Sequence, residues 1–196
     1  MRELGMRMDI IPGNHDVFYK DVNTPNSLKE LLGFFINEVA IIEKPTVLSY
    51  DTLKMALVPW INKSNYEETM DFIRNCKADI LGGHLELSGF DMMRGLKNEH
   101  GMDPSPFKRF DMVFSGHYHT KSSIDNIHYL GTQLEFFWSD CNDKKHFHVL
   151  DTETRELSAI HNPHTLFKRI VYNDEKYEYN SVQNLKDKFV KVIVVK

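Results

Sequence analysis

The sequence has few cysteines and no long apolar run, and this excludes several classes of protein. Its 196 residues contain two isolated cysteines, Cys76 and Cys141, which indicate neither a disulfide framework nor a thiolate zinc site. No apolar run approaches the roughly 18 residues that span a bilayer. Residues 1–5 also lack the charged-then-apolar pattern of a signal peptide. We therefore expect a cytoplasmic protein without a membrane segment.

Positive charge is also scarce. The 24 Lys and Arg residues are outnumbered by 28 Asp and Glu residues, which gives a net charge of -4. This charge argues against binding of nucleic acid through a bulk basic field, so we expect any contact with DNA to be local. With 41% hydrophobic residues the chain can bury a core, and its length fits one domain and the start of a second.

Three short apolar stretches each end in glycine followed by potential metal ligands. Such stretches predict strands, and the carboxyl ends of strands in an open α/β sheet meet in one crevice. Two histidines at i and i+2 on an extended segment project to the same side. We therefore expect the ligands to face one point, with Gly116 turning the backbone where its strand ends. The three stretches are residues 8–11 before Gly13-Asn14-His15-Asp16, residues 79–81 before Gly82-Gly83-His84, and residues 110–114 before Gly116-His117-Tyr118-His119.

A helix is predicted over residues 27–37. Ser27 and Glu30 have the spacing of a capping box, and Leu28, Leu31, Leu32, Phe35 and Ile36 share one helical face. Apolar faces usually serve burial, so we expect this face to point into the core.

Further elements follow from the same patterns. Residues 46–50 and 53–58 predict a hairpin, residues 65–77 a helix, and residues 88–107 a long functional loop. Strands are expected at residues 127–130, at 147–151 with 157–160, and near the end of the chain from Phe189.

The ordered motif set resembles the calcineurin-like metallophosphoesterases. A run from His84 to Phe90, followed by Arg94-Gly95-Leu96-Lys97 and His100-Gly101, narrows the resemblance further. It is similar to the recombination endonuclease subunits of tailed phages, in the double-strand-break-repair nuclease family. Members of that family work with an SMC-like ABC ATPase. The similarity runs from about residue 8 to residue 172.

The resemblance implies an α/β fold, a two-sheet sandwich flanked by helices, and a site with two divalent metal ions. Imidazole and amide ligands suit manganese, iron or zinc, and the family favours manganese. By motif match one metal is bound by Asn14, His84 and His117, and the other by His119. His15 acts on the phosphate as an acid or charge stabiliser, and Asp16 orients His15 through a hydrogen bond. Local DNA phosphate contacts are expected from Arg94, Lys97 and Lys121, for which surface solvation is an equally good account.

The sequence departs from the family in its carboxylates. The family uses an Asp-x-His and a Gly-Asp-x-x-Asp motif, and neither occurs in this chain. We therefore expect residues 1–172 to be a metallophosphoesterase domain without its first strand-helix units, and residues 173–196 to begin a capping domain. Such a fragment would bind metal weakly and have little or no activity alone, because no carboxylate offsets the cation's charge.

The expected function is a manganese-dependent DNA endo- or exonuclease subunit for phage recombination and repair, in the bacterial host cytoplasm. In the family, helices near this motif pair two subunits, so the face of residues 27–37 is an alternative homodimer contact. A second hypothesis keeps the metal-dependent hydrolysis but changes the substrate, so that the protein is a phosphoprotein phosphatase or nucleotide phosphodiesterase. A third hypothesis is a catalytically inactive module that binds DNA or the ATPase. His146 and His148 repeat the i, i+2 spacing without a glycine turn, and we expect no metal there.

Overall fold

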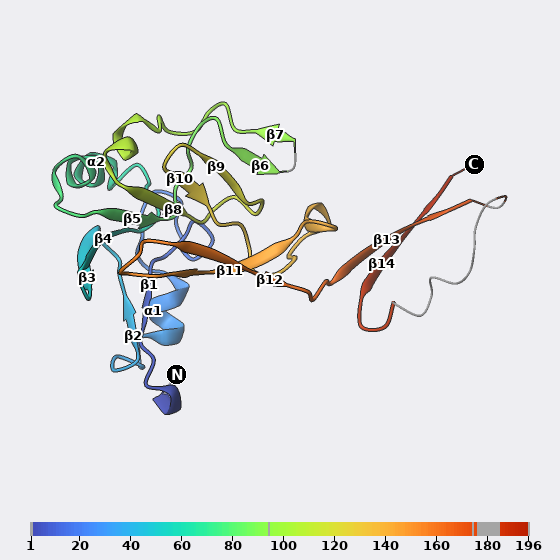
Figure 1. Cartoon of the computed structure of the whole chain (residues 1–196), viewed down its shortest axis with the longest axis horizontal. Coiled ribbons are helices and arrows are strands. Elements are labelled where there is room, and N and C mark those ends of the chain that lie inside the picture. Colours follow the sequence, from blue (N-terminus) through green and yellow to red (C-terminus); the bar gives the residue numbers. More distant parts are fainter. Residues whose placement is uncertain (1, 94, 174, 176–184, 196) are drawn as a thin grey trace.

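The computed structural model describes residues 2–93, 95–173, 175 and 185–195. Its centre is a six-stranded mixed sheet with the strand order β3-β4-β5-β8-β10-β9 (Figure 1). The four inner strands run parallel, and each edge strand is antiparallel to its neighbour. The predicted α/β class and the predicted hairpin are therefore confirmed. In sheet order the strands span Thr46–Tyr50, Leu53–Val58, Ile80–Gly83, Met112–Ser115, Ile127–Tyr129 and Ser122–Ile124.

The inner strands are apolar because both faces of the sheet are covered. On one face lie α2 (Tyr66–Asn75) and the 3-10 helix η2 (Ser105–Arg109), which bury Met70, Ile73 and Phe107. On the other face Leu150 and Leu157 of the hairpin β11–β12 (Lys145–Leu150 and Leu157–Asn162) pack against a smaller buried cluster. Burial of this kind on both faces is typical of parallel sheets. The helix predicted over residues 65–77 is confirmed.

Strands β5 and β8 are adjacent and end together. Gly83 is paired with Ser115 in the parallel register, so the segments that follow the two strands leave the same edge of the sheet. Every residue of β5 is buried, which fixes the strand between β4 and β8. The register therefore brings the segment of His84 beside that of His117.

The strand before Asn14 does not belong to this sheet, contrary to our expectation. β1 (Met8–Ile10) pairs in parallel with β2 (Val39–Ile41) in a separate two-stranded sheet. The segment after β1 still lies at the carboxyl edge of the central sheet, because the carbonyl of Pro12 accepts the Trp60 amide at 2.9 Å just after β4. A three-residue strand has few ladder bonds, so this loop contact places Asn14.

Helix α1 (Ser27–Leu32) is shorter than predicted and lies at the surface. Its N-cap is Asn26, whose side-chain oxygen accepts the Lys29 amide at 2.9 Å, so the capping box of Ser27 and Glu30 is wrong. The Gly33 amide closes the last turn on the Lys29 carbonyl. None of its residues is buried, so the core-facing interpretation is also wrong.

The stretch of residues 88–107 is better ordered than the loop we expected. It contains the short antiparallel pair β6 (Asp91–Met93) and β7 (Leu96–Lys97), and then η2. Phe90 and Phe107 are buried in the main core. Apolar burial therefore fixes this stretch to the sheet.

The last described strands extend away from the main sheet (Figure 1). β13 (Phe167–Tyr172) pairs in parallel with β14 (Phe189–Val194), which confirms the strand predicted near the end of the chain. The buried carboxylate of Glu135 accepts the amides of Leu166 at 2.6 Å and Phe167 at 2.9 Å. These bonds tie the start of β13 to the body. Within the described residues, no helix is long and apolar enough to cross a membrane.

Candidate metal centre

Asn14, His84 and His117 meet at the carboxyl edge of the central sheet. The side-chain oxygen of Asn14 lies 2.8 Å from Nε2 of His84 and 3.4 Å from Nδ1 of His117. The two imidazole centroids are 5.2 Å apart. Three side chains from distant parts of the sequence therefore present oxygen and nitrogen donors to one small volume, as the sequence predicted.

Glycines make this approach possible. A Cβ on Gly13 would lie 2.7 Å from Cε1 of His84, and one on Gly116 would lie 3.2 Å from its Nδ1. Gly116 was expected to turn the backbone, but the residue with a left-handed conformation is His117, at φ 81°. The role of Gly116 is to leave space for the His84 ring.

Trp60 forms a wall of the site that we did not predict. Its ring centroid is 5.9 Å from that of His84 and 5.5 Å from that of His117. The only sequence signal was its position directly after β4, at the edge where the histidines emerge. The indole therefore packs beside both imidazole rings.

The surroundings keep both imidazoles neutral. Burial lowers the pKa of His84 to about 3, with smaller contributions from the charges of His117 and His15. Burial also lowers the pKa of His117, against the charge of Glu86, which raises it. A neutral imidazole has a lone pair for a metal ion, so both residues are in a ligating form at neutral pH.

His15 lies at the exposed rim of this site. It lines a cavity of about 500 Å³ with Asp16, Phe18 and Ser27. We expected Asp16 to orient His15. In the part of the chain that the structure describes, its carboxylate bonds instead to the Gly13 amide at 2.7 Å and the Ser27 hydroxyl at 3.3 Å. Asp16 therefore shapes the loop that presents Asn14 and His15.

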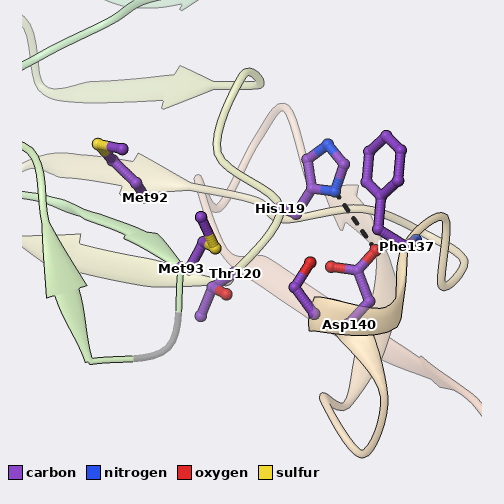
Figure 2. A pocket seen from close by; sticks show the side chains of 7 residues that line it. Met92, Met93, His119, Thr120, Phe137 and Asp140 are labelled. Carbon is purple, nitrogen blue, oxygen red and sulfur yellow. Dashed lines mark hydrogen bonds and ion pairs between the residues drawn. The ribbon is translucent and has the colours of Figure 1, made fainter.

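His119 has neighbours of its own, among them Phe137 and Asp140 (Figure 2). Its Nδ1 is 3.4 Å from Oδ2 of the buried Asp140, and its ring stacks on Phe137 with centroids 5.4 Å apart. Burial alone would raise the pKa of Asp140, but bonds from the Phe137 and Phe136 amides and the charge of Lys145 lower it overall. Asp140 was missed by the sequence analysis, since no motif marks it.

Carboxylates behind the histidines are a common support of metal sites, because they fix the tautomer of a ligating imidazole. Asp140 has this position behind His119. Glu86, two residues after His84, places Oε2 4.0 Å from Nε2 of His117. Both carboxylates would offset part of the charge of a cation, although we expected no carboxylate to do so.

The donor set fits one divalent cation at Asn14, His84 and His117. Neighbouring ligands on one cation are separated by roughly 3 Å when each bond is about 2.1 Å long. The measured 2.8 and 3.4 Å agree with this spacing. Among the described residues, no three His, Cys, Asp or Glu side chains cluster so as to hold a metal. The amide oxygen of Asn14 is therefore essential to the set.

The three predicted DNA contacts have different surroundings. Lys97 is exposed on β7, which agrees both with a DNA phosphate contact and with simple surface solvation. Lys121 lines a cavity of about 290 Å³ with His128 and His148, on the side of the sheet covered by β11–β12. Arg94 lies outside the described residues.

His146 and His148 lie on β11, and His146 faces His161 across the hairpin at 5.5 Å between centroids. Within the described chain no metal-binding group of three such side chains occurs here.

Two nuclease subunits are homologues of this chain. It is 37% identical over 193 residues to "Exonuclease subunit 1" of Enterobacteria phage T4, which covers 98% of this chain and 56% of that protein. It is 37% identical over 98 residues to a subunit of the SbcCD nuclease of Staphylococcus epidermidis. That second match covers 46% of this chain and 26% of the relative. No protein-family model matches the chain.

These matches confirm the predicted resemblance to phage and bacterial nuclease subunits. The longer match includes nearly the whole chain, so it extends over the central sheet and all four candidate ligands. The chain spans 56% of the length of that phage relative.

Proposed function

We propose that this homologue of two nuclease subunits is the metal-binding core of a DNA nuclease for phage recombination and repair. The observation that supports this best is the meeting of the Asn14 oxygen with the imidazoles of His84 and His117, at 2.8 and 3.4 Å. Neutral nitrogen and oxygen donors without thiolate suit a hydrolytic divalent metal, and we propose manganese. The two named relatives are both nuclease subunits.

We propose two divalent ions in the complete site, with Asn14, His84 and His117 at one and His119 at the other. Bound metal supplies charge neutralisation at the phosphate and an activated water. The side chains of this site do the rest. Trp60 packs beside the rings of His84 and His117, and Gly13 and Gly116 leave space for the His84 ring, so the ligands need little rearrangement to bind.

His15 is proposed to act on the substrate. It is exposed at the rim, beside the ligands, and its charge lowers the pKa of both His84 and His117. From this position it can stabilise a phosphate oxygen or protonate the departing oxygen. Asp16 contributes through the loop, since its bond to the Gly13 amide fixes the residue before Asn14.

We propose that the protein works together with a partner subunit. The relatives are named as subunits, and the family resemblance points to an SMC-like ABC ATPase as the partner subunit. Residues 1–172 would form the nuclease domain and residues 173–196 the start of a DNA-contacting capping domain. Arg94, Lys97 and Lys121 are proposed phosphate contacts, and the bacterial host cytoplasm is the proposed location.

A homodimer is proposed through α1 and the residues after it. Phe34 is 89% exposed and Ile36 is 76% exposed, and Leu31 and Phe35 lie exposed beside them. A contiguous apolar surface of this kind marks an interaction site, because its contact with water is unfavourable. Burial between two copies would remove it from water.

Manganese binding tests the proposed site without requiring turnover. We expect titration followed by electron paramagnetic resonance to show Mn²⁺ binding to the wild-type chain, weakened at least tenfold in His84→Ala and His117→Ala. His164→Ala, at an exposed position, is the matched control. Equal affinity in wild type and in both site variants would contradict the proposal.

Hydrolysis then identifies the substrate, in the chain and in the complex with its partner subunit. With manganese we expect the complex to cleave duplex or single-stranded DNA and the chain alone to have little or no activity. In the complex, His15→Ala should lower the rate by about 10² to 10⁴ while Mn²⁺ binding is kept. Cleavage of a phosphopeptide in preference to DNA at equal concentration would instead identify a phosphatase.

A further inference from the structure

The cavity between the central sheet and the hairpin β11–β12 combines one positive charge with several polar side chains. Its volume is about 290 Å³. Lys121, Ser123, His128 and His148 contribute its polar side chains, and no carboxylate is present among the described residues that line it. None of the four candidate metal ligands lines it either, so the cavity is not part of the metal centre described above.

Two imidazoles on the hairpin have buried ring nitrogens without a partner. His148 lines the cavity from β11, and within the described residues its Nε2 is inaccessible to solvent and has no hydrogen-bond partner. The same is true of Nδ1 of His146, two positions earlier on the same face of β11. A buried polar atom without a partner is unfavourable by about 1–3 kcal/mol. Two such atoms on one strand face indicate a site for a hydrogen-bonding ligand.

The imidazoles of the cavity are neutral donors. Burial lowers the pKa of His128 and of His148, and the charge of Lys121 lowers both further. Each ring therefore has one N–H group at neutral pH. Nδ1 of His128 lies 3.0 Å from the hydroxyl oxygen of Ser123. When this hydroxyl donates to Nδ1, the ring proton of His128 is on Nε2 and remains available to a ligand.

Lys121 supplies a cation without a counter-ion. In the part of the chain that the structure describes, Lys121 forms no ion pair, whereas the buried Lys145 contacts both Asp140 and Asp143. The side chain of Lys121 is exposed, so its ammonium can approach the cavity from the solvent side. An ammonium beside imidazole N–H groups favours an anion with several acceptor atoms, because hydrogen bonds between charged groups are the strong ones.

We propose that this cavity binds the phosphate group of a small molecule, held by the Lys121 ammonium and by ring N–H groups of His128 and His148. Phosphate oxygens point in several directions, so one phosphate can accept from a loop, from β10 and from β11 together. The inference goes beyond the proposed nuclease function and does not depend on it. The volume is close to the roughly 300 Å³ of small-molecule sites, so either free phosphate or a phosphate monoester has room.

Isothermal titration of inorganic phosphate into the wild-type chain, with EDTA present to keep the metal centre empty, is the first test. We expect saturable binding that becomes at least roughly tenfold weaker in Lys121→Met and in His148→Leu. Lys168→Met and His164→Leu, both at exposed positions, are the matched controls and should bind as the wild type does. Absence of saturable binding in the wild type, or unchanged affinity in both cavity variants, would overturn the inference.

Nuclear magnetic resonance of the histidine ring nitrogens locates the anion without any substitution, so it remains valid if a cavity variant fails to fold. We expect added phosphate to shift the ring signals of His128 and His148 and to leave those of the exposed His164 unchanged. Shifts confined to His84 and His117 would place the anion at the metal centre and overturn the inference.

Competing ligands identify the source of the phosphate group. Methyl phosphate that binds as tightly as inorganic phosphate would support the site and identify a monoester as the ligand, and weaker binding would support it with free phosphate. Acetate should bind at least roughly tenfold more weakly, because its planar carboxylate has two oxygens and one charge. Equal binding of acetate, or displacement of phosphate from these histidines by duplex DNA, would overturn the inference.

Discussion

The side-chain oxygen of Asn14 lies 2.8 Å from Nε2 of His84, although the two residues are 70 positions apart. This contact depends on a missing Cβ, because the His84 ring occupies the space beside Gly13. The neutral ring also depends on burial, which lowers its pKa to about 3. The geometry and the protonation state of the site therefore have a common cause, the close packing of a loop on a histidine.

Substitution of Gly13 should damage the metal site more than the fold. In Gly13→Ala the new methyl group would lie 2.7 Å from Cε1 of His84, so the ring must move away from Asn14. We expect Mn²⁺ affinity to fall at least tenfold, and the free energy of unfolding to fall by about 1–3 kcal/mol. Gly116→Ala, with a closest distance of 3.2 Å, should have a smaller effect on both. The reverse order of the two variants would contradict this account.

Acid should destabilise the metal-free protein through His84. The pKa of His84 falls from 6.5 to about 3 on folding, so between these values the unfolded chain binds more protons. The free energy of unfolding should therefore be unaffected by His84 above about pH 7 and decrease as the pH falls from 6.5 towards 3. The total loss is about 5 kcal/mol, because each pKa unit corresponds to about 1.4 kcal/mol.

Urea unfolding at several pH values in EDTA measures this dependence. His84→Gln should flatten the curve below pH 6.5, whereas His164→Gln at an exposed position should leave it unchanged. An equal slope in wild type and His84→Gln would show that other groups cause the acid loss.

Removal of the Asp140 charge should be strongly destabilising. Asp140 and Lys145 are both buried, and Oδ1 of Asp140 lies 3.3 Å from the Lys145 ammonium. Asp140→Asn leaves this ammonium with a weaker set of partners, and loss of a buried charge partner costs about 3–5 kcal/mol. Thermal unfolding of Asp140→Asn and of Asp143→Asn, whose carboxylate is more exposed, should show the larger loss in the former. Similar losses in both variants would contradict the role given to Asp140.

Charge at the exposed end of α1 should prevent self-association. Phe34→Lys places an ammonium in the apolar surface proposed as the dimer contact, and Ile36→Lys does the same. In sedimentation experiments over a range of concentrations we expect the wild-type chain to shift towards a dimer and both variants to remain monomeric. Phe147→Lys on β11 is the control. If the wild-type chain is monomeric at all concentrations, the proposed homodimer is wrong.

Much of the site could be predicted from the order of its motifs. Gly-Gly-His after one apolar strand and Gly-His-x-His after the next predicted that both strands end at one crevice of a sheet. The parallel register of Gly83 with Ser115 agrees with this. The helix of residues 27–37 was predicted less well. Its apolar spacing indicated burial, but the chain turns after Leu32 and leaves Phe34 and Ile36 in water. The spacing of apolar residues identifies an apolar helix face, but it does not show which part of the protein packs against that face.

The sequence by itself determined the α/β class, the hairpin of residues 46–58 and the convergence of His84 and His117, because these follow from local patterns and strand order. Asn14 was predicted at the same point, but a loop contact between Pro12 and Trp60 places it there. Tertiary structure alone decided that Trp60 walls the site, that Asp140 supports His119, and that β1 lies outside the main sheet. Those relationships join residues with no shared motif. They exist only because packing brings separate segments together, and the sequence of one segment does not show which other segments it will contact.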